Sequence, residues 1–480
     1  MSVSEFSYLD GHQRATLKAK VFDLLADYGV KLDPHPEMVD ALARSGLQLD
    51  RGTGLVRFPT QVLEELLAQA PSSFTLGARN PEKILPLPRP DGTFYARPCT
   101  GGHGWIDPDT QAYEKVTLAR LADWAKLVNH LDEISFMPFL FPNDAPVVSA
   151  DIHALVTLFK NTDKHLWVQP YCAESIMPLI SLAAAVAGGD SALISNPVIS
   201  MIACSLTPRS FKHMDIEIIV KAAQAGIPIH ACSLPGAGGT APATMLGTVL
   251  LTVAEIIAMV VMAQVVKPGA PVVACPIIFS TAMATGRSLQ ASVESMRGAS
   301  LADQILKQEF GLPTHNYGSG ADSPIPDEQS MSERAMVTTW MAASGLDILG
   351  GAGQLEVATV VSPLQLIIDN EVLAMARRLV APYLVDDDQM GWKPLTEIEP
   401  GMHFMLADHT LEHCHDSFMP HNFARPTRDE YEESGRQGLM DRVKENYLAL
   451  MAQENEAVAS AELSSELDDL AAEADKELGA

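Results

Sequence analysis

Apolar and polar positions divide the chain into short apolar runs that alternate with longer amphipathic segments. Eight of the short runs have the length and the residue types of buried strands. They cover residues 94–99, 134–141, 166–171, 198–204, 227–232, 272–278, 314–318 and 347–350. Most segments between them carry helix start and stop signals. Eight strands alternating with helices predict an α/β fold of the (β/α)8 TIM-barrel class, and a doubly wound open sheet is the alternative.

The segments outside this alternation predict accessory regions at both ends. Residues 1–90 are expected to form an N-terminal helical region, and residues 91–400 the catalytic barrel. Residues 401–453 are expected to form a polar and helical segment that packs on the barrel. Residues 454–480 are rich in acids and predict an acidic tail that is either a solvated helix or disordered. Within the first region, amphipathic segments predict helices over residues 14–28, 36–44 and 60–69.

One segment, residues 249–266, is apolar almost throughout. Glu255 and Gln264 interrupt it, and Pro268 ends it near the shortest length that spans a membrane. We therefore expect a buried helix. If part of it forms a subunit contact, the protein is a homodimer or a higher homo-oligomer.

Composition and charge narrow the classes of partner. Hydrophobic residues make up 47% of the 480 residues, which is enough for a large core. Sixty Asp and Glu against 33 Lys and Arg give a formal net charge of −27. This balance argues against a nucleic acid as partner, because phosphate binding needs a basic surface. It is compatible with a cationic or zwitterionic substrate.

The cysteines and the first residues predict a cytoplasmic protein. The six cysteines show no close pairing and no Cys-x-x-Cys motif, and most lie in apolar runs, as free thiols do in a reducing compartment. Residues 1–6 contain no basic stretch followed by an apolar one, so no secretory signal is predicted.

A glycine-rich turn over residues 236–240 follows one predicted strand and precedes the long apolar helix. Gly238 and Gly239 free the backbone to turn sharply, and such a turn can present N–H groups to an anionic ligand. Neither phosphate-loop pattern is matched, so an ordinary tight turn is the alternative.

The ends of the predicted strands carry an unusual share of aromatic and polar residues. In a (β/α)8 barrel, functional groups collect at the C-terminal ends of the strands. Aromatic faces attract quaternary ammonium ions by cation–π interaction, although any single ring could instead pack between sheet and helices. The predicted substrate-binding residues are Tyr95, Arg97, Phe139, Trp167, Tyr171, Gly238, Gly239, His315, Tyr317 and Gln354.

The segment over residues 316–329 follows the seventh predicted strand and contains glycines, two aspartates and a glutamine. An active-site lid and an ordinary surface loop are both compatible with it. Asp322 and Ser323 are the suspected catalytic residues within it, and no general acid or base is otherwise assigned.

A histidine cluster near the C-terminus raises the question of a metal. Its members are His403, His409, His413, His415 and His421. His409 and His413 are four residues apart, which can place both on one helix face. The chain has no His-Glu-x-x-His motif and no closed Cys/His set, so we predict no metal in the chain itself. A zinc-dependent barrel enzyme that uses this cluster is an alternative.

Several motifs together resemble one family, the trimethylamine methyltransferase family of corrinoid-dependent methyltransferases. The resemblance extends over most of the chain. It rests on Gly29-Val30-x-x-Asp33-Pro34-His35-Pro36, Thr240-Ala241-Pro242-Ala243-Thr244, Gln264-x-x-x-Pro268-Gly269, Gly320-Ala321-Asp322-Ser323-x-x-x-Asp327-x-Gln329-x-x-x-Glu333, Gly350-Gly351-x-Gly353 and His409-Thr410-Leu411.

The resemblance implies a TIM barrel that passes a methyl group from a methylated amine to Co(I) of a corrinoid (cobalamin). That cofactor is carried by a separate small corrinoid protein or supplied free. Trimethylamine-specific members carry pyrrolysine in a loop that matches residues 322–324, where this chain has standard residues. The resemblance therefore implies the non-pyrrolysine branch, with glycine betaine as the type substrate and proline betaine, carnitine or γ-butyrobetaine as alternatives. A non-catalytic betaine-binding protein is a further alternative.

The expected mechanism needs few catalytic groups. A quaternary ammonium is already positive, so its neutral amine can leave without protonation, and Co(I) is a strong nucleophile. The protein's part is to orient one methyl group toward the cobalt. Because positive charge on nitrogen falls during transfer, we expect an aromatic pocket with few negative charges at the ammonium.

Overall fold

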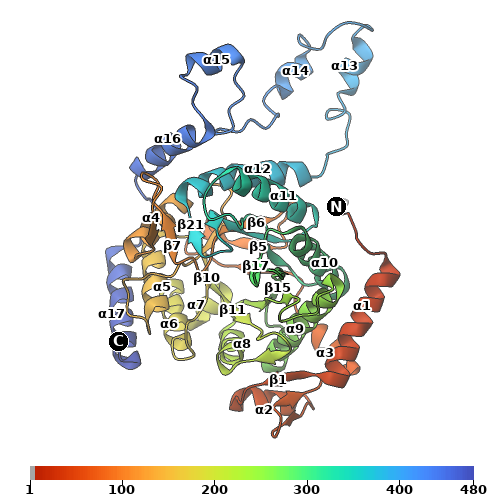
Figure 1. The fold of residues 1–480 in the computed structure, drawn as a ribbon, viewed down its shortest axis with the longest axis vertical. Coiled ribbons are helices and arrows are strands. Elements are labelled where there is room, and N and C mark those ends of the chain that lie inside the picture. The colour runs from red at the N-terminus through yellow and green to blue at the C-terminus, as the bar shows by residue number, and fades with distance from the viewer. Residues whose placement is uncertain (1–5) are drawn as a thin grey trace.

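The computed structural model describes residues 6–480, and eight parallel strands surrounded by helices form its centre (Figure 1). Five strands form one sheet in the order β15-β13-β11-β10-β9, and three form another in the order β18-β19-β6. Their bounds are β6 Tyr95–Pro98, β9 Phe136–Pro138, β10 His165–Val168, β11 Ile199–Cys204, β13 Ile229–Ser233, β15 Val272–Pro276, β18 His315–Tyr317 and β19 Ile348–Ala352. Each overlaps one predicted run, so all eight predicted strands are confirmed.

The two sheets meet at two places where the strand pairing is thin. One isolated parallel bridge joins Ala96 to Ile134, and another joins Ala274 to Thr314. The described strands therefore lack a continuous hydrogen-bonded ladder around the whole ring, but their order is circular. This order is that of a (β/α)8 barrel and not of a doubly wound open sheet.

Eight helices cover the outside of the ring (Figure 1). Their bounds are α4 Leu118–Asn129, α5 Ala150–Asn161, α6 Ile176–Ala187, α8 His213–Ala225, α9 Met245–Val266, α10 Val293–Phe310, α11 Glu328–Ala343 and α12 Pro363–Val380. The shorter α7 Asp190–Ser195 precedes β11.

Helix α9 is the predicted apolar helix, and the monomer itself buries it. By length and composition α9 is the one helix among the described residues that could cross a membrane, but 89% of its apolar window is buried. It packs against α1, α2, α3, α8 and α10. The prediction of a buried helix is confirmed, and the monomer's own core accounts for its apolar character without a subunit contact.

Helix α8 begins later than its sequence suggests. The pair Thr207-Pro208 carries a helix start signal, yet the helix starts at His213. Residues between them form β12 Ser210–Phe211, which pairs in parallel with β1 Val30–Leu32 of the N-terminal region. Pairing with a distant strand keeps this backbone extended and overrides the local signal.

The N-terminal region combines helices with a small sheet. The helices are α1 Gly11–Asp23, α2 Pro36–Arg44 and α3 Thr60–Leu67, with a π-helical turn, Leu24–Tyr28, after α1. The sheet has the order β12-β1-β3-β2, with β2 Leu49–Asp50 and β3 Leu55–Val56. The absence of a secretory signal was predicted from residues 1–6. Residues 1–5 lie outside the described residues.

A hairpin closes the end of the ring where the strands begin. It consists of β4 Phe74–Leu76 and β5 Leu85–Leu87, which precede β6 in the chain. Leu76, Leu85 and Leu87 form one buried apolar cluster with inward-pointing side chains of the ring. We call the opposite end, where the strands finish, the mouth of the barrel.

Two small sheets follow the strands at the mouth. One comprises β20 Gln354–Leu355, β21 Val360–Val361, β7 Gly104–Ile106 and β8 Tyr113–Lys115, and the other β14 Gly236–Ala237, β16 Phe279–Ala282 and β17 Arg287–Leu289.

The C-terminal part has two docked helices and one projecting segment. Helix α16 Leu439–Ala452 packs on α4 and α12, and α17 Ala461–Leu478 packs on α5 and α6. Leu467, Ala471 and Ala474 of α17 are buried, so the acidic tail is a docked helix and is neither fully solvated nor disordered.

Residues 382–437, which we call the arm, extend away from the ring between α12 and α16 (Figure 1). The arm contains α13 Trp392–Glu397, α14 Asp408–His413 and α15 Arg428–Glu433. Of the residues expected to pack on the barrel after position 400, those of α16 do so, as do Asn422, which is buried and donates its N–H to Glu371 of α12, and Phe423, whereas most of the arm projects from it.

Candidate functional site

Arg97 of β6 lies at the centre of the barrel and has no solvent exposure. Its guanidinium carbon is 4.2 Å from the ring centroid of Trp167 and 4.6 Å from that of Tyr317. The side chain has room because the neighbouring strand carries Gly350, where an added Cβ would lie 2.5 Å from the guanidinium carbon. Two aromatic faces therefore hold this cation by cation–π interaction.

The charge of Arg97 has no acidic partner. Its Nε donates to Nε2 of His315 at 2.7 Å, and its Nη1 donates to the backbone oxygen of Pro98 at 2.8 Å. Nη2 is buried without a hydrogen-bond partner, and no ion pair among residues 6–480 includes this guanidinium. A buried charge without a counter-ion is costly. An anionic group such as a carboxylate beside Nη2 would remove that cost.

Two neutral histidines extend the network below Arg97. Burial above all, with the positive charge of Arg97, holds the pKa of His315 and of His230 well below the usual value. Nε2 of His315 accepts from Arg97, so its proton lies on Nδ1, which is 2.9 Å from Nδ1 of His230. The proton of His230 must then lie on Nε2, which has no partner. The centre thus offers one fixed cation and no charged acid or base.

A second group of aromatic rings lies toward the mouth. Phe141 stacks on Tyr171 with centroids 4.5 Å apart, and Phe139 meets Tyr171 edge-on at 5.9 Å. The hydroxyl of Tyr171 is buried without a partner, and burial raises its pKa.

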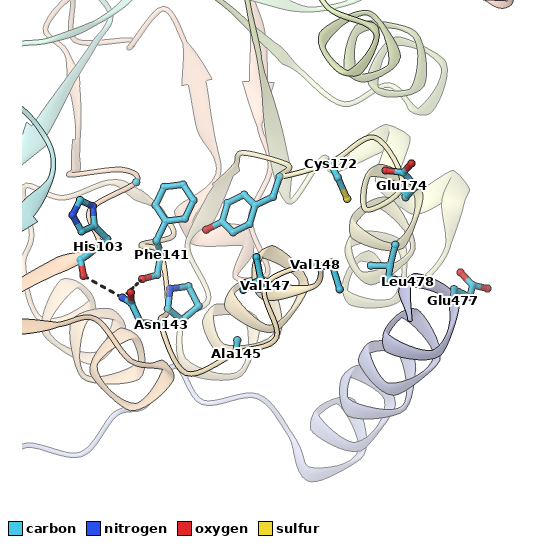
Figure 2. A pocket seen from close by; sticks show the side chains of 14 residues that line it. His103, Phe141, Asn143, Ala145, Val147, Val148, Cys172, Glu174, Glu477 and Leu478 are labelled. Atoms are coloured by element: carbon cyan, nitrogen blue, oxygen red, sulfur yellow. Dashed lines mark hydrogen bonds between the residues drawn. The ribbon is translucent and has the colours of Figure 1, made fainter. Parts of the chain in front are cut away.

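Phe141 and Tyr171 border a pocket of about 930 Å³ between the loops after β6, β9 and β10 and the end of α17. In Figure 2, His103 and Phe141 lie on one side of this pocket, and Glu174 and Glu477 on the other. The aromatic faces on one side of this pocket suit a cationic group.

The two suspected catalytic residues stabilise the loop after β18. The carboxylate of Asp322 accepts N–H bonds from Gln290 at 2.9 Å and Ala291 at 3.2 Å, and burial raises its pKa. The hydroxyl of Ser323 donates to Asp327 at 2.9 Å and to the backbone oxygen of Ile325 at 3.0 Å. Both side chains therefore act on loop conformation, and neither is a free nucleophile.

Gln354 lies beside this loop. Its amide nitrogen donates to the side-chain oxygen of Gln290, while its own Oε1 is buried without a partner. Gly351, whose added Cβ would lie 3.0 Å from the Tyr317 ring and 3.1 Å from this oxygen, separates Gln354 from Tyr317. Gln354 is thus near the central network and carries an unused acceptor.

The glycine-rich turn uses its own donors. The N–H groups of Gly239, Thr240 and Ala241 all point to the carbonyl of Gly236, at 2.9 to 3.1 Å, and Gly238 donates to Ala241. Helix α9 begins later, at Met245. The turn therefore lies on the rim of the mouth but offers these amides no open position for an anion.

Tyr95 lies at the far end of the ring. Its side chain belongs to the same apolar cluster as Leu76 and Trp167, and the guanidinium of Arg89 lies 5.3 Å from its ring centroid. The structure thus brings together Arg97, Trp167, His315 and Tyr317, with Gln354 nearby and the Phe139–Tyr171 pair toward the mouth. Tyr95 lies at the start of β6 beside Arg89, and Gly238 and Gly239 lie on the rim of the mouth.

The sequence reasoning missed His230, Cys275 and the role of Glu255. His230 lies in β13 between two apolar neighbours, and that alternation is the signal that could have placed it inside. The sulfur of Cys275 is 3.6 Å from Nδ1 of His315.

From the sequence, Glu255 was noted only as a charged residue that interrupts the apolar segment 249–266. Its buried carboxylate accepts from Ser205 at 2.5 Å, Ser233 at 2.6 Å and the N–H of Arg209 at 2.7 Å. It therefore ties the segment that follows β11 to the end of β13.

The histidine cluster lies on the arm, outside the ring (Figure 1). Asp388, His409 and His413 offer ligand atoms within 4.8 Å of one another. Nδ1 of His413 lies 2.6 Å from Asp416, and this bond raises the pKa of the histidine. No comparable group lies within the ring among the described residues, so these histidines are remote from Arg97.

Comparison with solved structures supports the fold. The monomethylamine methyltransferase MtmB of Methanosarcina barkeri matches with a TM-score of 0.57 at 13% identity, covering 93% of this chain and 89% of that one. The circular strand order, the helices around it and the polar centre below a mouth define a TIM barrel of the same class.

Sequence comparison identifies the family. A family model described as trimethylamine methyltransferase (MTTB) matches residues 2–479, so the chain belongs to this family and is a methyltransferase. The trimethylamine methyltransferase MttB of Desulfitobacterium hafniense is 26% identical over 440 residues, which cover 91% of this chain and 87% of that protein. A glycine betaine methyltransferase of the same species, strain Y51, is 26% identical over 424 residues, 87% of this chain and 86% of that protein. The resemblance inferred from the motifs is confirmed.

Proposed function

We propose that this protein transfers a methyl group from a quaternary amine that carries a carboxylate, such as glycine betaine, to Co(I) of a corrinoid held by a separate protein. The observation that carries the proposal is the buried guanidinium of Arg97, which has a free Nη2 and no acidic partner. A zwitterionic betaine supplies the missing carboxylate, whereas trimethylamine does not. The glycine betaine methyltransferase among the similar proteins also supports this reading.

The ammonium end of the substrate would lie nearer the mouth. Trp167 and Tyr317 were expected to contact it, but their faces already hold Arg97, and a second cation there would be repelled. The Phe139–Tyr171 pair remains the better candidate for that contact. The ammonium needs no carboxylate beside these two rings. Because its positive charge falls during transfer, a nearby anion would stabilise the substrate more than the transition state.

The chain's own residues bind, orient and exclude water in this proposal. The corrinoid supplies the Co(I) nucleophile. His230 and His315 stay neutral, so they hold Arg97 in place without moving a proton. The leaving amine is neutral and needs no acid, which agrees with a centre that has none.

The rim of the mouth supports docking of a partner protein. Large apolar side chains are exposed on the loops and elements that follow several strands: Val147, Leu234, Met283, Val293 and Ile325. Exposed apolar side chains that gather around an active-site opening are typical of a protein interaction surface. A small corrinoid protein is the partner that the proposed reaction requires.

Location and assembly are also proposals. The six cysteines are unpaired and three of them are buried, which supports a reducing compartment such as the cytoplasm. We also propose a homodimer or a higher homo-oligomer, in which the buried helix α9 does not form the subunit contact.

Two rival functions have less support. A zinc-dependent barrel enzyme would need the arm histidines, which lie outside the ring (Figure 1). A non-catalytic betaine-binding protein would use the same Arg97 but would not explain the apolar rim.

The test is incubation of the purified protein with free Co(I) cobalamin and a panel of donors: glycine betaine, proline betaine, carnitine, γ-butyrobetaine, tetramethylammonium and trimethylamine. Formation of methylcobalamin is followed by absorbance. We expect transfer from at least one carboxylate-bearing amine and none from trimethylamine. Saturable betaine binding without transfer, or a preference for trimethylamine, would refute the proposal.

A further inference from the structure

Gln354 of β20 carries a buried amide with one unsatisfied atom. The residue has no solvent exposure. Its Nε2 donates to the side-chain oxygen of Gln290, but its Oε1 accepts no hydrogen bond from any described residue. A buried amide oxygen without a partner costs free energy, so a donor from outside the chain would stabilise this site.

The surrounding chain confines this amide. The backbone oxygen of Gln354 accepts from Nη2 of Arg334, whose guanidinium forms a buried ion pair with Asp369. Gly320 lets the loop after β18 approach the amide closely, because an added Cβ there would lie 2.1 Å from Nε2. The position of Oε1 is therefore fixed by the fold.

Oε1 lies close to the ring that also holds Arg97. The guanidinium carbon of Arg97 is 4.6 Å from the ring centroid of Tyr317. The pairing of β19 with β6 is irregular at Gly351, where an added Cβ would lie 3.0 Å from the same ring and 3.1 Å from Oε1. Bulges of this kind occur beside active sites. The free Nη2 of Arg97 and the free Oε1 of Gln354 thus offer a donor and an acceptor near one aromatic ring.

These two free groups need different partners. The guanidinium takes a carboxylate, whereas an amide oxygen only accepts and therefore takes an O–H or an N–H group. Glycine betaine, proline betaine and γ-butyrobetaine have a carboxylate but, as zwitterions, no O–H and no N–H. Carnitine has a carboxylate and also a hydroxyl, on the carbon between its carboxymethyl and aminomethyl groups.

We propose that Gln354 determines substrate specificity: its Oε1 accepts a hydrogen bond from a hydroxyl group of the quaternary amine, so the preferred substrate is a hydroxylated betaine. The inference rests on the proposed function for the carboxylate at Arg97 and adds a second polar contact to it. An ordered water is the rival occupant of Oε1, and it would serve every betaine equally.

The same geometry selects one hand of the substrate. The carboxylate is held at Arg97, the hydroxyl at Gln354, and the ammonium toward the Phe139–Tyr171 pair. In the mirror-image molecule the hydroxyl points away from Oε1 once the other two groups are in place. The two enantiomers of carnitine should therefore differ as substrates.

The first measurement uses the wild-type chain and needs no variant. γ-Butyrobetaine, which is carnitine without the hydroxyl, is the matched ligand. Calorimetric titration gives the affinities, and methylcobalamin formation from free Co(I) cobalamin gives kcat/KM. We expect the better carnitine enantiomer to exceed both γ-butyrobetaine and its own mirror image about 10- to 100-fold, because each of these leaves the buried oxygen unpaired. Equal values in either comparison would overturn the inference.

The second measurement assigns the preference to Gln354. Gln354→Met keeps much of the side chain's shape but removes the acceptor, so the carnitine to γ-butyrobetaine ratio should fall about 10-fold or more. Gln61→Met, at an exposed position of α3, is the matched control and should keep the wild-type ratio. If Gln354→Met lowers the values for both substrates alike, the residue acts only on the fold and the inference is wrong. The wild-type comparison decides the matter if this variant does not fold.

The inference and the proposed function fail in different ways. Calorimetry requires no methyl transfer, so a carnitine preference that depends on Gln354, without methylcobalamin from any donor, would refute only the proposed function. Transfer from γ-butyrobetaine as efficient as that from carnitine would refute only the inference. Binding of neither molecule would refute both.

Discussion

The Nε of Arg97 donates to Nε2 of His315 at 2.7 Å, and this bond sets the direction of the whole central network. This bond requires His315 to present its proton to His230, and Nη2 of the same guanidinium is buried without a partner. The pair therefore holds a buried cation in one orientation, ready for an anion.

The first prediction concerns that cation. In Arg97→Gln, kcat/KM for glycine betaine should fall about 100-fold, because a charge-assisted hydrogen bond in a buried site is worth about 1.5–3 kcal/mol. Transfer from tetramethylammonium, which has no carboxylate, should change far less. Methylcobalamin formation measures both, with Arg51→Gln at an exposed position as the control. An equal loss for both donors would mean that Arg97 supports the fold and does not bind substrate.

The second prediction concerns the space for Arg97. Alanine at Gly350 would place a Cβ 2.5 Å from the guanidinium carbon, so Gly350→Ala should cost about 1–3 kcal/mol of unfolding free energy and displace the side chain. Gly239→Ala, whose added Cβ meets nothing nearer than 3.6 Å, should be tolerated. Denaturant unfolding and betaine affinity are the measurements. Equal stability of the two variants would contradict the close approach.

The third prediction concerns acid stability. Burial lowers the pKa of His165 to about 4. Its Nδ1 forms a hydrogen bond with the carbonyl oxygen of Gly77, and its Nε2 forms one with the hydroxyl of Ser200. The unfolded histidine takes up a proton near pH 6.5, so its contribution is complete above that pH and is lost as the pH falls toward 4. As the pH falls from 6.5 to 4, the unfolding free energy of His165→Gln should therefore rise by about 3 kcal/mol relative to that of wild type.

The measurement for His165 is the unfolding free energy of wild type and variant at several pH values. His12→Gln, an exposed substitution, is the control. A difference between wild type and His165→Gln that stays constant from pH 6.5 to 4 would show that His165 is not held neutral by burial.

The fourth prediction concerns Glu255. Its carboxylate accepts hydrogen bonds from the segment after β11 and from Ser233 at the end of β13, and Glu255→Gln turns one acceptor into a donor. The variant should lose about 1–3 kcal/mol because buried donors are left unpaired. Thermal unfolding tests this, with the exposed Glu64→Gln as its counterpart. A stability equal to that of wild type would show that water replaces these bonds.

The fifth prediction concerns metals. Since the arm histidines lie outside the ring, a chelator should leave methyl transfer to Co(I) cobalamin unchanged, and His409→Ala with His413→Ala should retain kcat. Elemental analysis should find no stoichiometric zinc. Loss of transfer on chelation, restored by zinc, would favour the zinc-dependent alternative.

Much of the fold was predictable because it is a local property of the chain. The period and length of apolar runs identified all eight barrel strands, and the composition of residues 249–266 identified a buried helix. One exception was α8, where pairing of residues 210–211 with β1 displaced the helix start signal of Thr207-Pro208. Another was the acidic tail, which is a docked helix.

The candidate site was predictable in part. Alternation along β6 places Tyr95 and Arg97 on the same inner face, but depth within a barrel depends on closure by distant strands. Tyr95 therefore packs beside Arg89 at the start of β6, while Arg97 lies between the rings of Trp167 and Tyr317 at the centre.

The sequence by itself determined the family, the alternation of strands and helices and the presence of aromatic residues near the strand ends, because these follow from residue type and spacing. Only the tertiary structure decided that Trp167 and Tyr317 hold Arg97 and that the arm is left uncovered. Both results depend on which distant segments meet, and contacts between distant segments have no period in the chain.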